Sequence, residues 1–206
     1  WLTEQQLNDL KHLCQKVGMR LGIYGDLAVN SSRGSVDVWS QPELYCVKAS
    51  VGAPPDPLGP VGQNWNLPPY NPSQLKATGF AAVITMLRAN MQHFGILRID
   101  HVMGLFRLWL IPEGKTAADG VYVHYPFDEL MAILAIESQR NQCLIIGEDL
   151  GTVPDEVRWE FSRILCCILL NAIANIHMRM NSHAMLMRRL VHTMCRPCKV
   201  SGIAVI

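Results

Sequence analysis

The chain has 206 residues, half of them hydrophobic and 17% of them charged, and its formal net charge is +1 at pH 7. This length suffices for one domain but is shorter than the roughly 250 residues of a complete (β/α)8 barrel. The longest apolar stretch, residues 164–176, contains two Asn and falls short of the roughly 20 apolar residues that cross a bilayer, and no leader-like segment opens the chain, so we expect a cytoplasmic protein without a membrane anchor.

The first predicted elements are a helix, a strand and a long loop. Apolar residues recur at helical spacing through residues 4–17, and Thr3 with Gln6 resembles a capping box, so this segment is predicted to form an amphipathic helix. Residues 20–29 are predicted to form a strand. Residues 30–72 are rich in Pro, Gly, Ser and Asn, and a loop of this length in a compact domain is usually functional.

Two further pairs of a helix and a strand follow the predicted loop. The apolar pattern predicts, in order, a helix at 80–94, a strand at 96–102, a helix at about 130–137 and a strand at 143–147. A helix followed by a strand, three times over, implies an α/β fold with a parallel sheet or barrel.

Acidic residues stand at the ends of all three predicted strands: Asp26, Asp100 and Glu148. Arg98 and Asp100 are two residues apart, so both project from one face of their strand, with Ile99 on the other face. Two carboxylates on neighbouring strand ends are what cleavage of a glycosidic bond needs, and barrel enzymes hold their chemistry at that rim. The structural alternative is an ion pair between Arg98 and Asp100, with Glu148 and Asp149 capping the next helix.

Several longer stretches match one family of carbohydrate-active enzymes. They are Gly25-Asp26-Leu27-Ala28-Val29, Lys48-Ala49-Ser50-Val51-Gly52-Ala53-Pro54-Pro55-Asp56, Gly62-Gln63-Asn64-Trp65, Leu87-Arg88-Ala89-Asn90-Met91, Leu97-Arg98-Ile99-Asp100-His101-Val102, Tyr122-Val123-His124-Tyr125-Pro126 and Ile146-Gly147-Glu148-Asp149-Leu150-Gly151-Thr152-Val153-Pro154. On these stretches, residues 1 to about 157 resemble the 4-α-glucanotransferases, or amylomaltases, of glycoside hydrolase family 77 in the α-amylase superfamily. The resemblance implies the middle strands of a (β/α)8 barrel, with residues 30–72 as a long active-site loop.

By this resemblance Asp100 is the catalytic nucleophile, and Glu148 is the general acid that later serves as the base. The chemistry requires Asp100 to be ionised and Glu148 to carry a proton until the bond is cleaved. Retention of configuration requires the two carboxyl groups to be about 5 to 5.5 Å apart. A covered site that excludes water favours transfer to a sugar hydroxyl, so we expect disproportionation of maltodextrins without a metal or organic cofactor.

The resemblance also assigns residues that bind the substrate. Arg98 would keep the nucleophile charged and oriented, while His101 and Asp26 would bind sugar hydroxyls at the cleavage point. In the long loop, Asp56 would bind hydroxyls and Trp65 would offer an apolar face to a glucose ring. Without the resemblance, Trp65 is equally well explained as a loop anchor, and His101 as a buried structural histidine.

The sequence is also compatible with two other functions. A hydrolytic α-glucanase would use the same two carboxylates with water as the acceptor, and a truncated, non-catalytic protein would merely bind α-glucan. Oligosaccharide products longer than the substrate would indicate transfer. The oligomeric state and the preferred glucan length stay open.

The chain also departs from the family pattern. Family members carry a third carboxylate in a His-Asp pair on a later strand, and this chain contains no His-Asp pair. Residues 1–160 hold 17 acidic and 12 basic residues, a net charge of −5, whereas residues 161–206 hold six basic and no acidic residues. We therefore expect a partial catalytic barrel domain over residues 1–157, a tail over residues 158–206 that comes from a shifted reading frame or an unnatural end, and little activity for the chain alone.

The tail contains four of the seven Cys. A zinc site there would use Cys195, Cys198, His183 and His192, but a single C-x-x-C without a second pair is a weak signal for zinc. Its basic residues are sparse among apolar ones, so we expect no nucleic-acid partner. In the rest of the chain three Cys are expected to be buried free thiols, namely Cys14, Cys46 and Cys143.

Overall fold

The computed structural model describes residues 1–57 and 59–150, which form two compact units. The first unit holds Trp1–Leu27, Ile84–His101 and the described residues from 131 onward, and the second holds Ala28–Val83 and Val102–Leu130. One unit contains a parallel sheet and the other an antiparallel sheet, so the architecture is mixed α/β. The domain boundary expected near residue 157 lies outside the described residues and stays a prediction.

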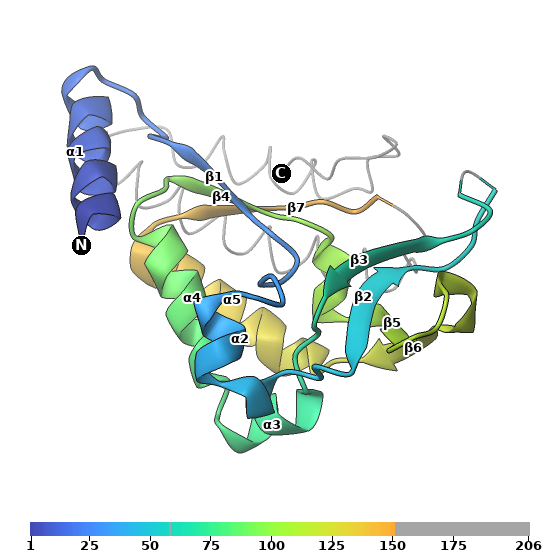
Figure 1. Ribbon diagram of the computed structural model, residues 1–206. Helices are drawn as coiled ribbons and strands as arrows, with labels where there is room; N and C mark the ends of the chain where they lie inside the picture. Colours follow the sequence, from blue (N-terminus) through green and yellow to red (C-terminus); the bar gives the residue numbers. More distant parts are fainter. Residues whose placement is uncertain (58, 151–206) are drawn as a thin grey trace. The chain divides into compact units, whose positions relative to one another are not determined.

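Three parallel strands form the sheet of the first unit, in the order β1 (Tyr24–Leu27), β4 (Ile96–Ile99) and β7 (Leu144–Gly147) (Figure 1). In this register Asp26 lies opposite Arg98. The prediction of a parallel sheet from alternating helices and strands is confirmed, although β1 and β4 are shorter than the predicted strands.

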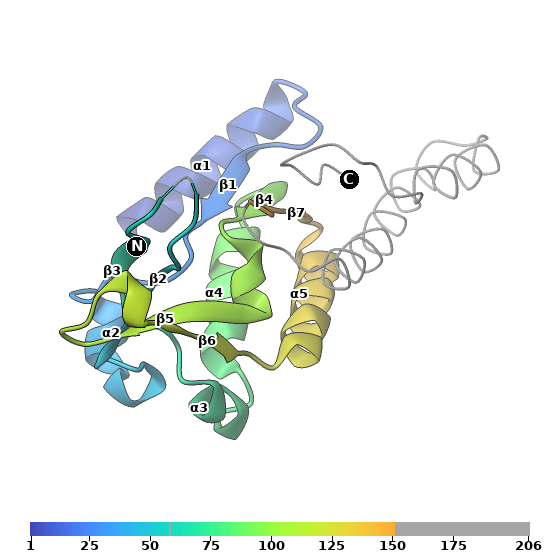
Figure 2. The same cartoon turned by 90° about the vertical axis from the view of Figure 1, so that its right-hand side faces the viewer.

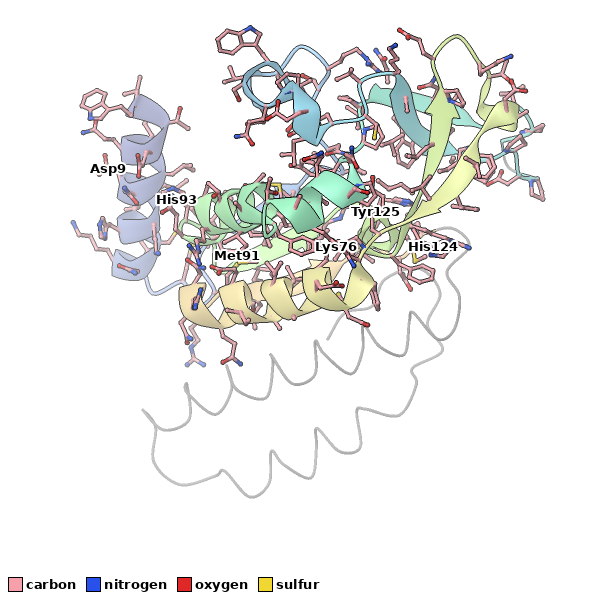
Figure 3. All side chains as sticks on the ribbon, turned by 90° about the horizontal axis from the view of Figure 1, so that it is seen from below. Asp9, Lys76, Met91, His93, His124 and Tyr125 are labelled. Carbon is pink, nitrogen blue, oxygen red and sulfur yellow. The ribbon has the colours of Figure 1, made fainter. Side chains whose placement is uncertain are left out.

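Three helices belong wholly or mainly to this unit: α1 (Leu2–Lys16), α4 (Ala81–Met91) and α5 (Phe127–Asn141). Helices α4 and α5 lie on the same face of the sheet (Figures 1 and 2). The buried core of this unit includes Met91 of α4 and Leu97 of β4, both with no exposed surface. Met91 is labelled in Figure 3. The predicted capping box is wrong, because α1 already begins at Leu2, so that Thr3 lies within the helix.

A buried carboxylate joins α4 to α5. The Glu137 side chain of α5 is 3% exposed. Arg88 of α4 donates from Nε and Nη2 to its two carboxylate oxygens at 2.7 and 2.8 Å, and Arg140 donates from Nη1 at 3.0 Å. The hydrogen bond from Arg88 is the largest influence on the carboxyl and holds the pKa of Glu137 below its ordinary value, while burial opposes this effect.

The second unit contains an antiparallel sheet in the order β3 (Gln63–Leu67), β2 (Ala49–Ala53), β5 (Arg107–Pro112) and β6 (Val121–His124). Two short helices, α2 (Val36–Ser40) and α3 (Pro72–Ala77), flank β2 and β3 in the sequence. Both begin at a side-chain cap: the Ser35 hydroxyl accepts from the Val38 N–H, and the Asn71 amide oxygen accepts from the N–H groups of the first turn of α3.

The prediction of one long loop over residues 30–72 is wrong, because α2, β2 and β3 lie within it. Pro54 and Pro55 lie in the turn between β2 and β3, so the Pro-rich composition marks the turn of a hairpin. Gly52 lies inside β2, where a Cβ atom would collide with the carbonyl oxygen of Gln63. Turn residues and a strand glycine therefore gave a whole hairpin the composition of a loop.

Strands β5 and β6 were also missed, although β5 carries a period-2 signal. Leu108 and Leu110 are buried, while Arg107 and Trp109 alternate with them and are only partly buried. Across the hairpin, the Trp109 ring meets the Tyr122 ring edge to face at 4.9 Å, and the Arg107 guanidinium lies 4.1 Å from the centre of the Tyr122 ring. Aromatic and cationic side chains thus stabilise this hairpin.

Three tyrosines pack together elsewhere in the second unit. The rings of Tyr45 and Tyr70 stack with their centres 4.8 Å apart. Tyr125, labelled in Figure 3, donates its hydroxyl to the Tyr70 carbonyl oxygen at 2.6 Å. Burial raises the pKa of both Tyr70 and Tyr125, so both phenols stay protonated and the Tyr125 hydroxyl remains a donor.

The cysteines of the described residues are free thiols. Cys14 and Cys143 are buried as expected, whereas Cys46 is partly exposed. Burial raises the pKa of the Cys143 thiol to about 12. The candidate zinc ligands Cys195 and Cys198 lie outside the described residues. Within residues 1–57 and 59–150, no helix has both the length and the apolar character of a membrane span.

We expect Arg88→Ala to lower the Tm of the chain more than Arg140→Ala does. Arg88 supplies two of the three hydrogen bonds from arginine to Glu137, so its loss leaves a buried carboxylate with a single cationic partner. Thermal unfolding followed by circular dichroism measures the difference. Equal Tm values for the two variants would show that the Arg88 pairing does not hold α4 to α5.

The same carboxylate predicts a dependence of stability on pH. Because the pKa of Glu137 is lower in the folded chain than in the unfolded chain, its ionised form stabilises the fold at neutral pH, and this contribution is lost as the pH falls through the lowered pKa. The Tm of the wild-type chain should therefore fall more steeply on acidification than the Tm of Glu137→Gln. Parallel Tm curves for the two proteins would contradict this assignment.

Candidate active site

The parallel sheet brings the carboxyl ends of β1, β4 and β7 to one edge. Asp26 lies in β1, Asp100 directly follows β4 and Glu148 directly follows β7. Backbone hydrogen bonds fix these ends beyond the strands, since the Asp100 N–H donates to the Leu27 carbonyl at 2.9 Å and the Glu148 N–H donates to the Ile99 carbonyl at 3.0 Å. The expectation of acidic side chains gathered on neighbouring strand ends is confirmed within the first unit.

Alternation along β4 decides where the charged side chains point. Leu97 and Ile99 are buried, whereas Arg98 between them is only partly buried. Side chains of successive strand residues point to opposite faces, so Arg98 projects away from the apolar side of the sheet. The strand therefore separates the core from the charged cluster.

Arg98 contacts three carboxylates at once. Its Nη1 lies 2.7 Å from Asp26 Oδ1, and its Nη2 lies 2.9 Å from Asp100 Oδ1 and 3.7 Å from Glu148 Oε2. The hydrogen bond to Asp26 raises the pKa of the Arg98 guanidinium above its ordinary value, with burial opposing and the charges of Asp26 and Asp100 adding to the rise. Arg98 is thus a permanent cation among three acidic groups.

The three acidic side chains differ in their access to water. Asp26 is 58% exposed, Asp100 is 38% exposed and Glu148 is 16% exposed. Burial disfavours the charged form of a carboxyl group, whereas a nearby cation favours it. Asp100, which makes a direct ion pair with Arg98, and Glu148, which is more buried and further from the guanidinium, are therefore in unequal environments.

His101 reaches Glu148 through its backbone. Its N–H donates to Glu148 Oε2 at 2.7 Å, and its φ of 45° lies in the left-handed region. Burial lowers the pKa of the His101 imidazole, and the charge of Asp100 partly opposes this. The imidazole is therefore neutral at pH 7 and offers one donor and one acceptor nitrogen.

The structure groups five of the predicted site residues in the first unit: Asp26, Arg98, Asp100, His101 and Glu148. It does not group the other two with them, because Asp56 and Trp65 belong to the second unit.

The two residues in the second unit make local contacts. Asp56 lies in the turn between β2 and β3, where its carboxylate accepts from the Gly59 N–H. Trp65 lies in β3, is partly buried, and donates from Nε1 to Gln63 Oε1 at 2.9 Å. These contacts hold both side chains in the hairpin, as expected if Trp65 is a local anchor.

The Arg98–Asp100 ion pair, which the sequence offered as a structural alternative to a catalytic site, is present within the cluster. Arg98 and Asp100 do form an ion pair, but the same guanidinium also binds Asp26, which spacing along the sequence did not indicate. The possible capping role of Glu148 concerns residues after 150, which lie outside the described part of the chain. The backbone contact of His101 carries no sequence signal, because a left-handed conformation at a histidine is not visible in residue types.

The charge at the centre of the site comes from Arg98. Among the described residues, no group of three or more His, Cys, Asp or Glu side chains is arranged to hold a metal ion. The guanidinium instead lies among the carboxylates and balances part of their charge. The cluster therefore presents two neighbouring carboxyl groups in unequal environments, which is the arrangement that acid and nucleophilic chemistry on a glycosidic bond uses.

Comparison with known proteins points to one family. A relative from Haemophilus influenzae, a 4-alpha-glucanotransferase, is 81% identical over 162 residues, which are 79% of this chain and 23% of the relative. The 4-alpha-glucanotransferase of Mycobacterium tuberculosis H37Rv is 38% identical over 158 residues, covering 77% of this chain and 22% of the relative.

Solved structures agree with the sequence relatives. The crystal structure of amylomaltase from Corynebacterium glutamicum matches with a TM-score of 0.78 and 36% identity, over 80% of this chain and 23% of that one. Amylomaltase from Streptococcus agalactiae in complex with acarbose matches with a TM-score of 0.68 and 30% identity, over 80% of this chain and 33% of that one. The chain thus spans between about a quarter and a third of the length of these relatives.

The sequence model of the family described as 4-alpha-glucanotransferase, glycoside hydrolase family 77, matches residues 1–181. The match extends past residue 157, where the resemblance was expected to end. It covers most of the 206 residues and includes all seven predicted site residues. The chain therefore belongs to the 4-alpha-glucanotransferase family, glycoside hydrolase family 77.

Proposed function

We propose that this chain carries the two reacting carboxyl groups of a 4-α-glucanotransferase, which transfers α-1,4-glucan segments between maltodextrins with retention of configuration. The observation that carries the proposal is the contact of Arg98 with three carboxylates at the ends of adjacent parallel strands. Membership of the family supports the reaction, and the acarbose complex of a relative supports a carbohydrate substrate.

We also propose that β1, β4 and β7 are neighbouring strands of a (β/α)8 barrel, whose carboxyl ends carry the site. Residues 1–157 would form part of that barrel domain. The tail expected over residues 158–206 overlaps the family match, which extends to residue 181, so we propose a different origin only for residues 182–206. Because the 206 residues contain no His-Asp pair, they do not supply the third carboxylate of the family in its usual motif. We therefore expect the isolated chain to turn over substrate slowly, if at all, compared with the full-length polypeptide from the gene.

In the first step of the proposed reaction, Asp100 attacks the anomeric carbon of a glucose unit. The bond from that carbon to the glycosidic oxygen breaks, and Glu148 gives its proton to the leaving oxygen. The Arg98 guanidinium contacts Asp100 Oδ1 at 2.9 Å and so holds the attacking carboxylate in place. The product of this step is a glucosyl ester on Asp100.

The contacts of Arg98 limit the separation of the two carboxyl groups. Asp100 Oδ1 and Glu148 Oε2 both lie near Arg98 Nη2, so they cannot be further apart than the sum of 2.9 and 3.7 Å. Retaining enzymes hold their carboxyl groups about 5 to 5.5 Å apart, whereas inverting enzymes need about 6.5 to 9.5 Å to admit a water molecule. This limit admits the retaining separation and excludes nearly all of the inverting range, and the proposal of double displacement rests on membership of the family.

In the second step, Glu148 removes the proton from an acceptor hydroxyl, which attacks the anomeric carbon and releases Asp100. A sugar hydroxyl gives transfer and a new α-1,4 bond, whereas water gives hydrolysis. Asp26 and the neutral His101 imidazole would bind hydroxyls of the glucose unit at the cleavage point. Asp56 would bind sugar hydroxyls, and Trp65 would present its ring to a glucose face.

The distribution of product lengths tests the proposed function. We expect the full-length polypeptide to convert maltotriose into glucose and into oligosaccharides longer than maltotriose, which chromatography resolves. Shorter products alone would indicate a hydrolytic α-glucanase. Binding of maltodextrin without turnover by the full-length polypeptide would indicate a glucan-binding protein and would overturn the proposal.

Replacing Glu148 and replacing Asp100 should change the rates on two substrates differently. Glu148→Gln should lower kcat on maltotriose on the order of 100- to 10,000-fold, because it removes the acid. It should retain much more of its first-step rate on α-glucosyl fluoride, because fluoride leaves without a proton. Asp100→Asn should lose the rate on both substrates. Rapid cleavage of the fluoride by Asp100→Asn would rule out Asp100 as the nucleophile.

A third prediction concerns kcat after replacement of Arg98, whose guanidinium lies at the centre of the site. Arg98→Lys should reduce kcat roughly tenfold or more, because a single ammonium group cannot reproduce the two nitrogens that contact separate carboxylates. Arg140→Lys is the matched control, since Arg140 contacts only the buried Glu137 among the described ion pairs. Comparable kcat values for Arg98→Lys and the wild type would show that the charge alone suffices.

A further inference from the structure

The residue after the proposed nucleophile has an unusual backbone conformation. His101 has a φ of 45°, in a region that side chains with a Cβ rarely adopt, although His, Asn and Asp are found there more often than other residues. Its N–H donates to Glu148 Oε2 at 2.7 Å. The left-handed turn therefore coincides with a short hydrogen bond to the proposed acid.

The peptide unit just before this contact, between Ile99 and Asp100, is anchored on both sides. The Asp100 N–H is bonded to the Leu27 carbonyl of the neighbouring strand at 2.9 Å. On the other strand, the Glu148 N–H is bonded to the Ile99 carbonyl at 3.0 Å. The backbones of both carboxylate-bearing residues are thus fixed by the sheet, and the His101 N–H adds the contact that fixes the Glu148 side chain.

The two oxygens of Glu148 have different surroundings. Oε2 accepts from the His101 N–H and lies 3.7 Å from Arg98 Nη2. Arg98 Nη2 also contacts Asp100, and Arg98 Nη1 contacts Asp26. Among the residues that the structure describes, no donor is bonded to Oε1. Donors favour negative charge on the oxygen that they contact, so a proton on Glu148 is more stable on Oε1.

We propose that His101 is a positioning residue that acts through its backbone: its left-handed conformation holds the N–H on Oε2 of Glu148 and leaves Oε1 as the oxygen that gives and takes the proton. The contact to Glu148 stands on geometry alone, and its effect on catalysis rests on the proposed function. In the first step the Oε1 proton passes to the leaving oxygen, and in the second step Oε1 receives the proton of the acceptor hydroxyl. Throughout both steps Oε2 keeps the N–H.

Four substitutions at His101 all remove the imidazole but differ in the backbone conformation that they allow. Comparing them separates the effect of the backbone from any contact between the ring and the substrate. Gly and Asn adopt a positive φ readily, so His101→Gly and His101→Asn should keep the N–H in place. Ala and the β-branched Val disfavour this conformation, so His101→Ala and His101→Val should move the N–H away. The two pairs differ in backbone preference and share the loss of the ring.

Nuclear magnetic resonance of the ¹⁵N-labelled chain detects the hydrogen bond between the His101 N–H and Glu148 and does not require the chain to be catalytically active. As the pH rises and Glu148 ionises, the His101 amide proton should shift downfield in the wild-type chain, and the corresponding residue-101 amide should do so in His101→Gly and His101→Asn. Glu148→Gln should abolish this step, whereas Asp100→Asn should retain it, which distinguishes Glu148 from the other carboxyl group nearby. In His101→Ala the step should be strongly reduced.

Activity of the full-length polypeptide gives the second reading. The Ala and Val variants should have a kcat roughly tenfold to a hundredfold below the Gly and Asn variants, because a displaced acid transfers its proton poorly. The limb of the pH profile that reports the acid should move in the Ala and Val variants only. If His101→Val does not fold, as judged by Tm, the Ala and Gly variants make the same comparison.

Two results would overturn the inference. One is an amide step that persists in Glu148→Gln, because the His101 N–H would then respond to another group. The other is equal kcat and equal pH profiles for the Gly and Ala variants, because the backbone conformation would then be irrelevant. If the wild-type full-length polypeptide has no transferase activity but the His101 amide proton still shifts with pH as described, the proposed function is wrong and the contact itself is established.

Discussion

The site depends on one constraint: a single guanidinium must lie within contact distance of carboxylates from three different strands. Three acidic groups this close would repel one another without a cation between them. Arg98 meets this requirement because it lies in the central strand, β4, with β1 on one side and β7 on the other. Moving this arginine by one residue along the strand would turn it to the apolar face of the sheet.

The parallel register explains how residues distant in sequence meet there. Asp26 and Arg98 are direct partners across β1 and β4, and backbone bonds continue the ladder beyond the strands to Asp100 and Glu148. The helices behind the sheet supply its support, since α4 and α5 are linked by the buried Glu137 and its two arginines. The chemistry at the edge is thus positioned by hydrogen bonds of the sheet and by packing of the helices.

Sequence reasoning succeeded where periodicity and local signals agree with the fold. The alternation of apolar segments predicted α1, α4, α5 and the three parallel strands, and the two-residue spacing in β4 predicted the charged face. It failed for the antiparallel sheet, because Pro54, Pro55 and Gly52 made a hairpin look like a loop. It also could not find the His101 N–H, since that contact depends on a backbone angle rather than on a residue type.

The most direct test of this account is to trap the covalent intermediate. A fluorinated glucosyl fluoride, which forms the ester quickly and releases it slowly, would be added to the full-length polypeptide, and the labelled peptide identified by mass spectrometry after proteolysis. The account predicts one glucosyl label, on the peptide that contains Asp100, and no label in Asp100→Asn. A label on Glu148, on Asp26 or on a peptide outside the cluster would contradict it.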